Sequence, residues 1–221
     1  MIRVVSHVSV KSRARRGRLF VSSLLPRESD RILDLGGGDG AYFASVLPYR
    51  SNVCVADISA DALAQARRRG FDTAVIAESG PLPFPDGHFD VVFCSSAIEH
   101  ATVDKADLRT PLTNREFRRI AYSHQLAFAR EIRRLGKRYF VQTPNRYFPI
   151  ETHSWLPFVV VFLPRSLQID LIDFMNRWWP KKTKPDWSLL TRRQMTELFP
   201  DARIVTERWL GLPKSIIAIK G

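Results

Sequence analysis

The chain has 221 residues, and its 34 Lys and Arg residues outnumber its 22 Asp and Glu residues, which gives a formal net charge of +12 at pH 7. Hydrophobic residues make up 45% of the chain and charged residues 25%, which is ordinary for a globular protein and excludes a disordered chain. The length predicts one domain. The excess of positive charge favours an anionic partner: a polyanion, a phosphorylated substrate or an anionic membrane surface.

The cysteines and the apolar runs indicate where in the cell the protein is located. Cys54 and Cys94 each lie within an apolar run, so we expect both to be buried and reduced. Basic residues interrupt the first 20 residues, so no secretory signal is predicted. The longest apolar run, 155–163, is about half the roughly 20 residues that span a bilayer. We therefore expect a cytoplasmic protein, with contact at the inner face of a membrane as a further option.

Apolar runs and helical periodicity alternate along the first part of the chain. They predict strands at 31–35, 53–56, 73–77, 89–94 and 138–142, with helices at 41–47, 59–69 and 114–135. This alternation is typical of a parallel sheet with helices on both faces. After Pro144 it stops, and the pattern predicts helices at 166–178 and 191–199, then strands at 203–208 and 215–219. The predicted fold class is α/β.

The first predicted strand leads directly into a glycine cluster, Gly36-Gly-Gly-Asp-Gly40. Glycine lets the backbone turn tightly and lets a ligand approach the main chain. The cluster fits two patterns, Asp-x-Gly-x-Gly-x-Gly starting at Asp34 and the dinucleotide fingerprint G-x-G-x-x-A starting at Gly36. Asp34 favours a ligand with an ammonium group, such as S-adenosylmethionine, because a carboxylate repels a pyrophosphate. Asp57 ends the second strand. A carboxylate there can accept hydrogen bonds from both ribose hydroxyls, whether the ligand is a dinucleotide or S-adenosylmethionine.

Several motifs in order along residues 31–100 carry a closer match. They are the glycine cluster, the acidic strand end Asp57-Ile58, the stretch 78–92 and the stretch 95–100 after the fourth strand. Together they resemble the core of class I S-adenosylmethionine-dependent methyltransferases, in the type 11 group similar to quinone-biosynthesis methyltransferases. The resemblance implies a Rossmann-like seven-stranded sheet of order 3-2-1-4-5-7-6 with helices on both faces, and S-adenosylmethionine as the cofactor.

The resemblance also implies which residues contact the cofactor. These are Asp34, Gly36, Gly37, Gly38, Gly40, Asp57, Ile58, Glu78, Ser79 and Ser95. Within this set, Asp34 would lie near the ammonium group and Asp57 would hold the ribose hydroxyls. Glu78 would accept a hydrogen bond from the adenine amino group, and Ser95 would line the side of the methyl donor.

The acceptor side is expected after the fifth strand, because ligands bind at the carboxyl edge of doubly wound sheets. In the segment 142–153, Glu151 and His153 are the candidate catalytic residues, since an acid can orient an imidazole as a general base. His88, His100 and His124 are the other candidate bases, of which we expect His88 at the surface and His124 on a helix face. The alternative is a proline-stiffened lid whose polar groups bind its own backbone. No metal is expected.

Residues 155–179 carry large apolar and Trp side chains, and Lys181, Lys182 and Lys184 follow them. This pattern suits a segment on an anionic bilayer, and equally a cap over a lipophilic pocket or a dimer face. We expect one methyltransferase domain over 1–221, with a basic N-terminal helical segment at 1–30 and an inserted substrate cap at 144–188.

The acceptor is expected to be a small molecule or a lipid-linked group, methylated at oxygen. The fourth strand leads into Cys94-Ser-Ser-Ala97 instead of the Asn/Asp-Pro-Pro-aromatic sequence that similar enzymes use on nucleic-acid bases. Nucleic acid is therefore the less favoured substrate. Two other readings stay open, an RNA or DNA methyltransferase and a non-catalytic partner subunit that binds S-adenosylmethionine. The oligomeric state is not predicted.

Overall fold

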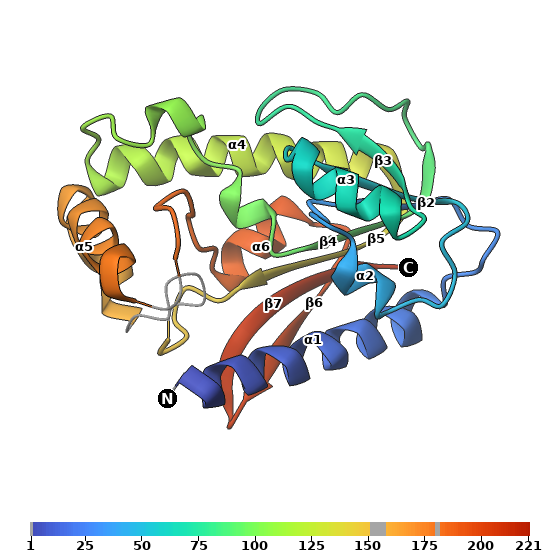
Figure 1. Ribbon diagram of the computed structural model, residues 1–221, viewed down its shortest axis with the longest axis horizontal. Helices are drawn as coiled ribbons and strands as arrows, with labels where there is room; N and C mark the ends of the chain where they lie inside the picture. Colours follow the sequence, from blue (N-terminus) through green and yellow to red (C-terminus); the bar gives the residue numbers. More distant parts are fainter. Residues whose placement is uncertain (1, 151–157, 180–181) are drawn as a thin grey trace.

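The computed structural model describes residues 2–150, 158–179 and 182–221, with the backbone alone for residues 2–9 and 158 (Figure 1). A seven-stranded sheet of order β3-β2-β1-β4-β5-β7-β6 runs through this part of the chain. β7 is antiparallel to both of its neighbours, and the other pairs are parallel. The expected class I order and the α/β fold class are confirmed.

The strands are β1 (Ile32–Leu35), β2 (Val53–Asp57), β3 (Asp72–Val75), β4 (Phe89–Ser95), β5 (Gly136–Pro144), β6 (Arg203–Trp209) and β7 (Leu212–Lys220). The helices are α1 (Ile2–Leu24), α2 (Ala41–Ala44), α3 (Ala60–Arg68), α4 (Asn114–Leu135), α5 (Arg165–Trp178) and α6 (Arg192–Leu198). Short 3₁₀ helices are η1 (Ile98–His100), η2 (Lys105–Asp107) and η3 (Phe158–Phe162).

Two helices show how local sequence sets the boundaries. α4 has the predicted bounds because Thr113 and Glu116 form a capping box at its start. α2 ends at Ala44, earlier than the predicted helix 41–47. Pro48 disfavours helical backbone in the residue before it, and the Arg50 side chain donates to the carbonyl of Ala44 at 3.0 Å.

Different helices cover the two faces of the sheet (Figure 1). Alternate residues of a strand point to opposite faces, so Ile32 packs with α1, α2 and α3 while Leu33 packs with α4 and α6. On the first face, Phe20 of α1 is fully buried against the rings of Phe93 and Phe140, at centroid distances of 4.9 and 5.7 Å. These aromatic contacts anchor α1 to the sheet.

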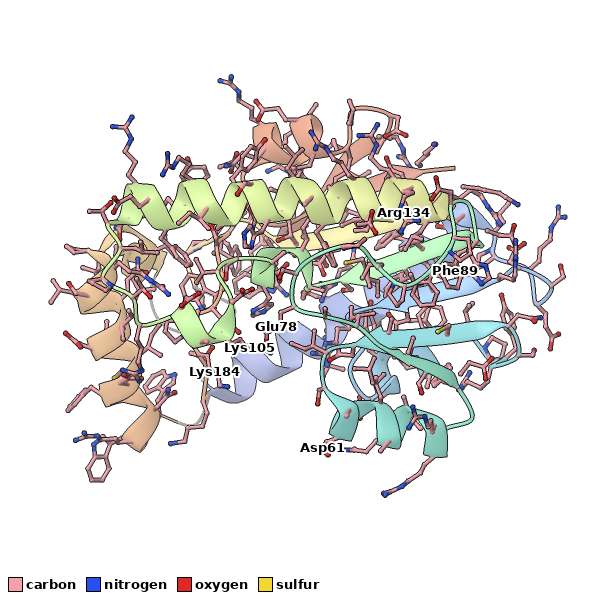
Figure 2. The ribbon with its side chains drawn as sticks, turned by 90° about the horizontal axis from the view of Figure 1, so that it is seen from above. Asp61, Glu78, Phe89, Lys105, Arg134 and Lys184 are labelled. Atoms are coloured by element: carbon pink, nitrogen blue, oxygen red, sulfur yellow. The ribbon has the colours of Figure 1, made fainter. Side chains whose placement is uncertain are left out.

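The connection from β3 to β4 contains no helix and is held by side chains of α4. Arg134 donates to the carbonyls of Leu82 and Phe84, at 3.2 and 2.8 Å, and Glu131 accepts from the Leu82 N–H at 2.7 Å. Figure 2 shows Arg134 beside Phe89 at the start of β4. Because these bonds tie the loop to a long helix, the loop's beginning, at Glu78, has a defined place beside the sheet.

The segment between β5 and α6 forms a small apolar cluster of its own, at the α5 end of the molecule (Figure 1). Val160 and Val161 of η3 pack with Ile172 of α5, and Trp187 and Leu189 complete the cluster. Polar side chains of α4 bind its backbone: Arg118 donates to the Val161 carbonyl at 2.6 Å. The cluster thus stands beside the N-terminal end of α4.

Candidate cofactor site

A cavity of about 270 Å³ opens at the carboxyl edge of the sheet, beside the ends of β1, β2 and β4. Its lining residues are Gly36, Asp57, Ile58, Ile76, Ala77, Glu78, Ser96, Ala97, His100, Ala101, Thr102, Val103, Lys105, Phe128 and Asp186. This edge is where ligands bind in doubly wound sheets. Four of the residues predicted to contact the cofactor, Gly36, Asp57, Ile58 and Glu78, are among the lining residues.

The glycine cluster after β1 wraps the edge of this cavity. Gly36, Gly38 and Gly40 have φ angles of +72°, +57° and +69°, in the left-handed region that glycine adopts without strain. A Cβ atom added to Gly38 would meet only open space and the Asp57 Oδ2 atom at 4.0 Å. The main chain is therefore bare at this point, so a ligand can approach it closely.

Asp57 is fixed between two backbone N–H groups at the end of β2. Its Oδ2 atom accepts from the Gly38 N–H at 2.9 Å, and its Oδ1 atom accepts from the Ser59 N–H at 2.9 Å. A carboxylate has about four acceptor positions on its two oxygens, so two bonds leave capacity for hydroxyl donors. Asp57 is also one of the residues that line the cavity.

Asp34 lies beneath the glycine cluster and is 4% exposed. Its carboxylate lies so close to Gly37 that a Cβ added there would be 2.2 Å from the Asp34 Oδ2 atom. Burial, and secondarily the negative charge of Asp57, raises the pKa of Asp34 from its ordinary 3.8 to about 8. A cation bound beside the cluster would offset both effects.

Glu78 lies at the other end of the cavity, facing Lys105 (Figure 2). Its Oε2 atom accepts from the Lys105 backbone N–H at 2.9 Å, and its Oε1 atom is 3.3 Å from the Lys105 Nζ atom. The segment that holds η2 is thus joined to the start of the β3–β4 loop. Lys105 itself lines the cavity, and it was not among the residues predicted from the sequence.

The end of β4 turns sharply toward the cavity. Ser95 donates from its hydroxyl to the Gln142 Oε1 atom of β5 at 2.8 Å, whereas the next residues, Ser96 and Ala97, line the cavity. Ser96 has a φ of +59°, a strained conformation for a residue with a side chain. Its hydroxyl also donates to Gln142, at 3.2 Å, and Arg16 of α1 donates to the same oxygen. These bonds hold the strained turn in place.

The remaining predicted residues have distinct places. Gly37, Gly40 and Ser79 are close in the chain to residues that line the cavity, but they do not line it themselves. The predicted catalytic residues Glu151 and His153 lie outside the described residues, so their roles stay predictions.

The structure pairs His100, one of the candidate bases, with a residue that the sequence did not indicate, Asp186. His100 and Asp186 both line the cavity, and the His100 Nδ1 atom is 3.0 Å from the Asp186 Oδ1 atom. His100 stands in the stretch after β4 that carries the family resemblance. Asp186 lies 86 residues further along, in a segment where no motif signals a role, so only the fold brings the two together.

Comparison with known proteins agrees with the predicted resemblance. Residues 33–121 match the family model described as a methyltransferase domain. The match confirms the resemblance of this part of the chain to the S-adenosylmethionine-dependent methyltransferases of class I.

Curated relatives match the same part of the chain, and solved structures share its fold. The chain is 35% identical over 96 residues to the ubiquinone/menaquinone biosynthesis C-methyltransferase UbiE of Ectopseudomonas mendocina, covering 39% of this chain and 38% of the relative. It is 30% identical over 105 residues to UbiE of Shewanella woodyi, covering 43% and 42%. The chain thus spans about two fifths of the length of these relatives. Among solved structures, magnesium protoporphyrin IX methyltransferase of Synechocystis with bound SAH has a similar fold, with a TM-score of 0.51 at 14% identity over 100% of this chain and 85% of that one.

The methyltransferase site fits S-adenosylmethionine by its own chemistry. The bare backbone at Gly38 leaves room for a ligand, and the anchored Asp57 can accept hydroxyl donors. Asp34 lies buried beneath the glycine cluster. Among the described residues, the acids Asp34, Asp57 and Glu78 lie in or next to the place where a cationic nucleoside would bind.

Proposed function

We propose that this protein transfers a methyl group from S-adenosylmethionine to a hydroxyl of a small-molecule or lipid-linked acceptor. The observation that carries the proposal is the Asp57 carboxylate, held by the N–H groups of Gly38 and Ser59 at the rim of a cavity. A carboxylate in this place accepts ribose hydroxyls. The acid Glu78 at the other end of the cavity suits the adenine amino group, and Ile58 between them offers an apolar wall.

The chemistry asks little of the protein beyond placement. S-adenosylmethionine, when bound, supplies an activated methyl group on a sulfonium. Holding two reactants in line can supply about 7–11 kcal/mol of the barrier. Gly36, Asp57 and Glu78 would place the donor, while the part of the cavity lined by His100 and Asp186 would receive the acceptor.

The atom that receives the methyl group is part of the proposal. We propose oxygen, because a histidine paired with a carboxylate borders the cavity and can take up a hydroxyl proton. The UbiE relatives are named C-methyltransferases, which favours carbon as the second candidate. With ¹³C-labelled donor, the product methyl carbon resonates in the O-methyl or the C-methyl region of an NMR spectrum, and an O-methyl signal is expected.

Donor binding can be tested with one pair of acidic residues. We expect Asp57→Ala to abolish binding of S-adenosylmethionine in calorimetry, because it removes the anchored acceptor of the ribose hydroxyls. Asp61→Ala is the matched control, since Asp61 is an exposed acid in the first turn of α3 (Figure 2). Equal affinity in the wild type and Asp57→Ala would refute the assignment of this residue. No binding to the wild type would refute the proposed donor.

We also propose that the outer face of α5 rests on an anionic membrane at its cytoplasmic side. Leu167, Phe174 and Trp178 are 53%, 58% and 82% exposed and lie on one stripe of the helix. The exposed Arg177 is next to this stripe, and the exposed Lys184 follows it in the chain (Figure 2). Apolar side chains flanked by cations suit an anionic lipid surface. Within the described residues, no helix is long and apolar enough to cross a bilayer.

Vesicle co-sedimentation tests this surface. We expect the protein to bind vesicles that contain phosphatidylglycerol more strongly than vesicles of phosphatidylcholine alone, and Trp178→Glu to weaken that binding. Leu210→Glu is the control, because Leu210 is 80% exposed on the β6–β7 turn, away from α5. Equal binding by both variants would remove α5 from the proposal.

A further inference from the structure

His100 and Asp186 reach the cavity from different parts of the fold. His100 is the last residue of η1, which follows β4, and Asp186 lies in the segment between α5 and α6. The His100 Nδ1 atom and the Asp186 Oδ1 atom are 3.0 Å apart, a hydrogen-bond distance. Both residues line the cavity together with Gly36 and Asp57.

Backbone hydrogen bonds hold the two segments together. The Thr102 hydroxyl donates to the Asp186 carbonyl at 2.9 Å, and the Ser188 N–H donates to the Glu99 carbonyl at 2.8 Å. The Gln125 amide of α4 then donates to the Ser188 carbonyl at 2.8 Å. Bonds on both sides of the pair show that its geometry is built into the fold and does not depend on two mobile side chains meeting.

The carboxylate determines the protonation pattern of the ring. A carboxylate can only accept, so the hydrogen bond assigns the proton of the neutral imidazole to Nδ1. Nε2 is then the nitrogen that can take up a proton. The other charged groups that line the cavity are Asp57, Glu78 and Lys105, from the ends of β2 and β3 and from η2.

We propose that His100 accepts the proton of the acceptor hydroxyl during methyl transfer and that Asp186 positions its ring. The proposal rests on the proposed function and narrows its substrate class to acceptors with an ionisable O–H group. As the O–H bond breaks, its proton passes to His100 Nε2 and the oxygen forms a bond to the methyl carbon. The bond from that carbon to sulfur breaks, its electron pair stays on the sulfur, and S-adenosylhomocysteine leaves. The proton on His100 is then released to water.

Other described histidines do not meet these conditions. The His88 ring stacks on the Phe84 ring at a centroid distance of 6.2 Å, in the β3–β4 loop. His124 lies on α4 and does not line the cavity. His100 is therefore the histidine of the described chain that combines a carboxylate partner with a place beside the donor residues.

The first test needs no acceptor. Side-chain ¹⁵N NMR of the folded protein should show His100 with its proton on Nδ1, assigned by loss of the signals in His100→Gln. Asp186→Asn should move that proton toward Nε2, because an amide can donate to Nδ1. An unchanged proton position in Asp186→Asn would overturn the positioning role of Asp186.

Two ligands separate this proposal from the proposed function. S-adenosylmethionine carries a positive sulfonium where S-adenosylhomocysteine has neutral sulfur, so a ring beside the transferred methyl should give different signals with the two. Identical His100 signals with both ligands bound would overturn the proposal and with it the argument for oxygen, while the proposed donor and methyl transfer would stand. Failure of both ligands to bind in calorimetry would overturn the proposed function and this proposal with it.

The second test measures transfer. With labelled S-adenosylmethionine and the cell fraction that accepts label, His100→Gln should lower turnover by about 10²–10⁴-fold while its calorimetric affinity for the donor is unchanged. His124→Gln should keep wild-type turnover. Wild-type turnover in His100→Gln would overturn the proposal.

Discussion

Asp34 offers the sharpest prediction, because the fold buries an acid that the donor would need as an anion. The raised pKa, about 8 against an ordinary 3.8, means that the folded protein binds a proton here that the unfolded chain releases. The free energy of unfolding therefore falls as the pH rises from about 4 to about 8, by at most about 1.4 kcal/mol per pH unit. Asp34→Asn removes this dependence.

Comparing the wild type with Asp34→Asn isolates the contribution of Asp34 to the pH dependence of stability, since the two proteins share all their other titrating groups. Between pH 6 and pH 8 the stability of the wild type relative to Asp34→Asn should fall by on the order of 2 kcal/mol. Urea unfolding followed by circular dichroism at several pH values measures this difference. If the difference is the same at pH 5 and pH 8.5, Asp34 is not held protonated in the folded protein and the reasoning is refuted.

The same acid predicts a coupling between donor binding and pH. Without ligand, Asp34 is protonated at neutral pH, so an ammonium group bound beside it should expel the proton. Calorimetry at pH 7 in buffers of different ionisation enthalpy should detect proton release in the wild type and less release in Asp34→Asn. Equal release in both proteins would place the ammonium group elsewhere.

Three further substitutions test packing and backbone conformation. Gly37→Ala should lower the free energy of unfolding by about 1–3 kcal/mol in urea titrations, because its Cβ would be 2.2 Å from the Asp34 Oδ2 atom and 2.9 Å from Val55. Gly38→Ala, where the space is open, should lower it by about 1–2 kcal/mol because of the left-handed backbone, and should also weaken donor binding. Phe20→Ala should cost about 3–5 kcal/mol, because it empties a fully buried ring site beneath α1; a loss near zero would mean that α1 is not anchored by this ring.

Much of the fold follows from local signals. The helical periodicity of 114–135 and the alternation of strands and helices predicted α4 and the parallel part of the sheet. The strand order came from the resemblance of the motifs to a known family, because periodicity alone does not say which strands are neighbours. The end of α2 was missed because the predicted helix ran past Ala44 into the turn before Pro48.

Some residues of the candidate site could likewise be predicted from the sequence, and others could not. The glycine cluster and Asp57 could be found from the sequence, since left-handed backbone after a strand and an acid at the next strand end are local requirements. Lys105 beside Glu78 and Asp186 beside His100 could not, because each partner comes from a distant segment without a motif.

The sequence by itself therefore predicted a methyltransferase domain and its donor, because the glycine cluster and the acidic strand ends that carry this prediction are encoded within a few residues. Tertiary structure decided which groups meet at the cavity. It buries Asp34 beside Asp57, which raises the pKa of the Asp34 carboxyl group to about 8, and it brings a carboxylate from beyond α5 to the His100 ring that follows β4. Burial and long-range pairing depend on how the elements pack, which no short stretch of sequence specifies.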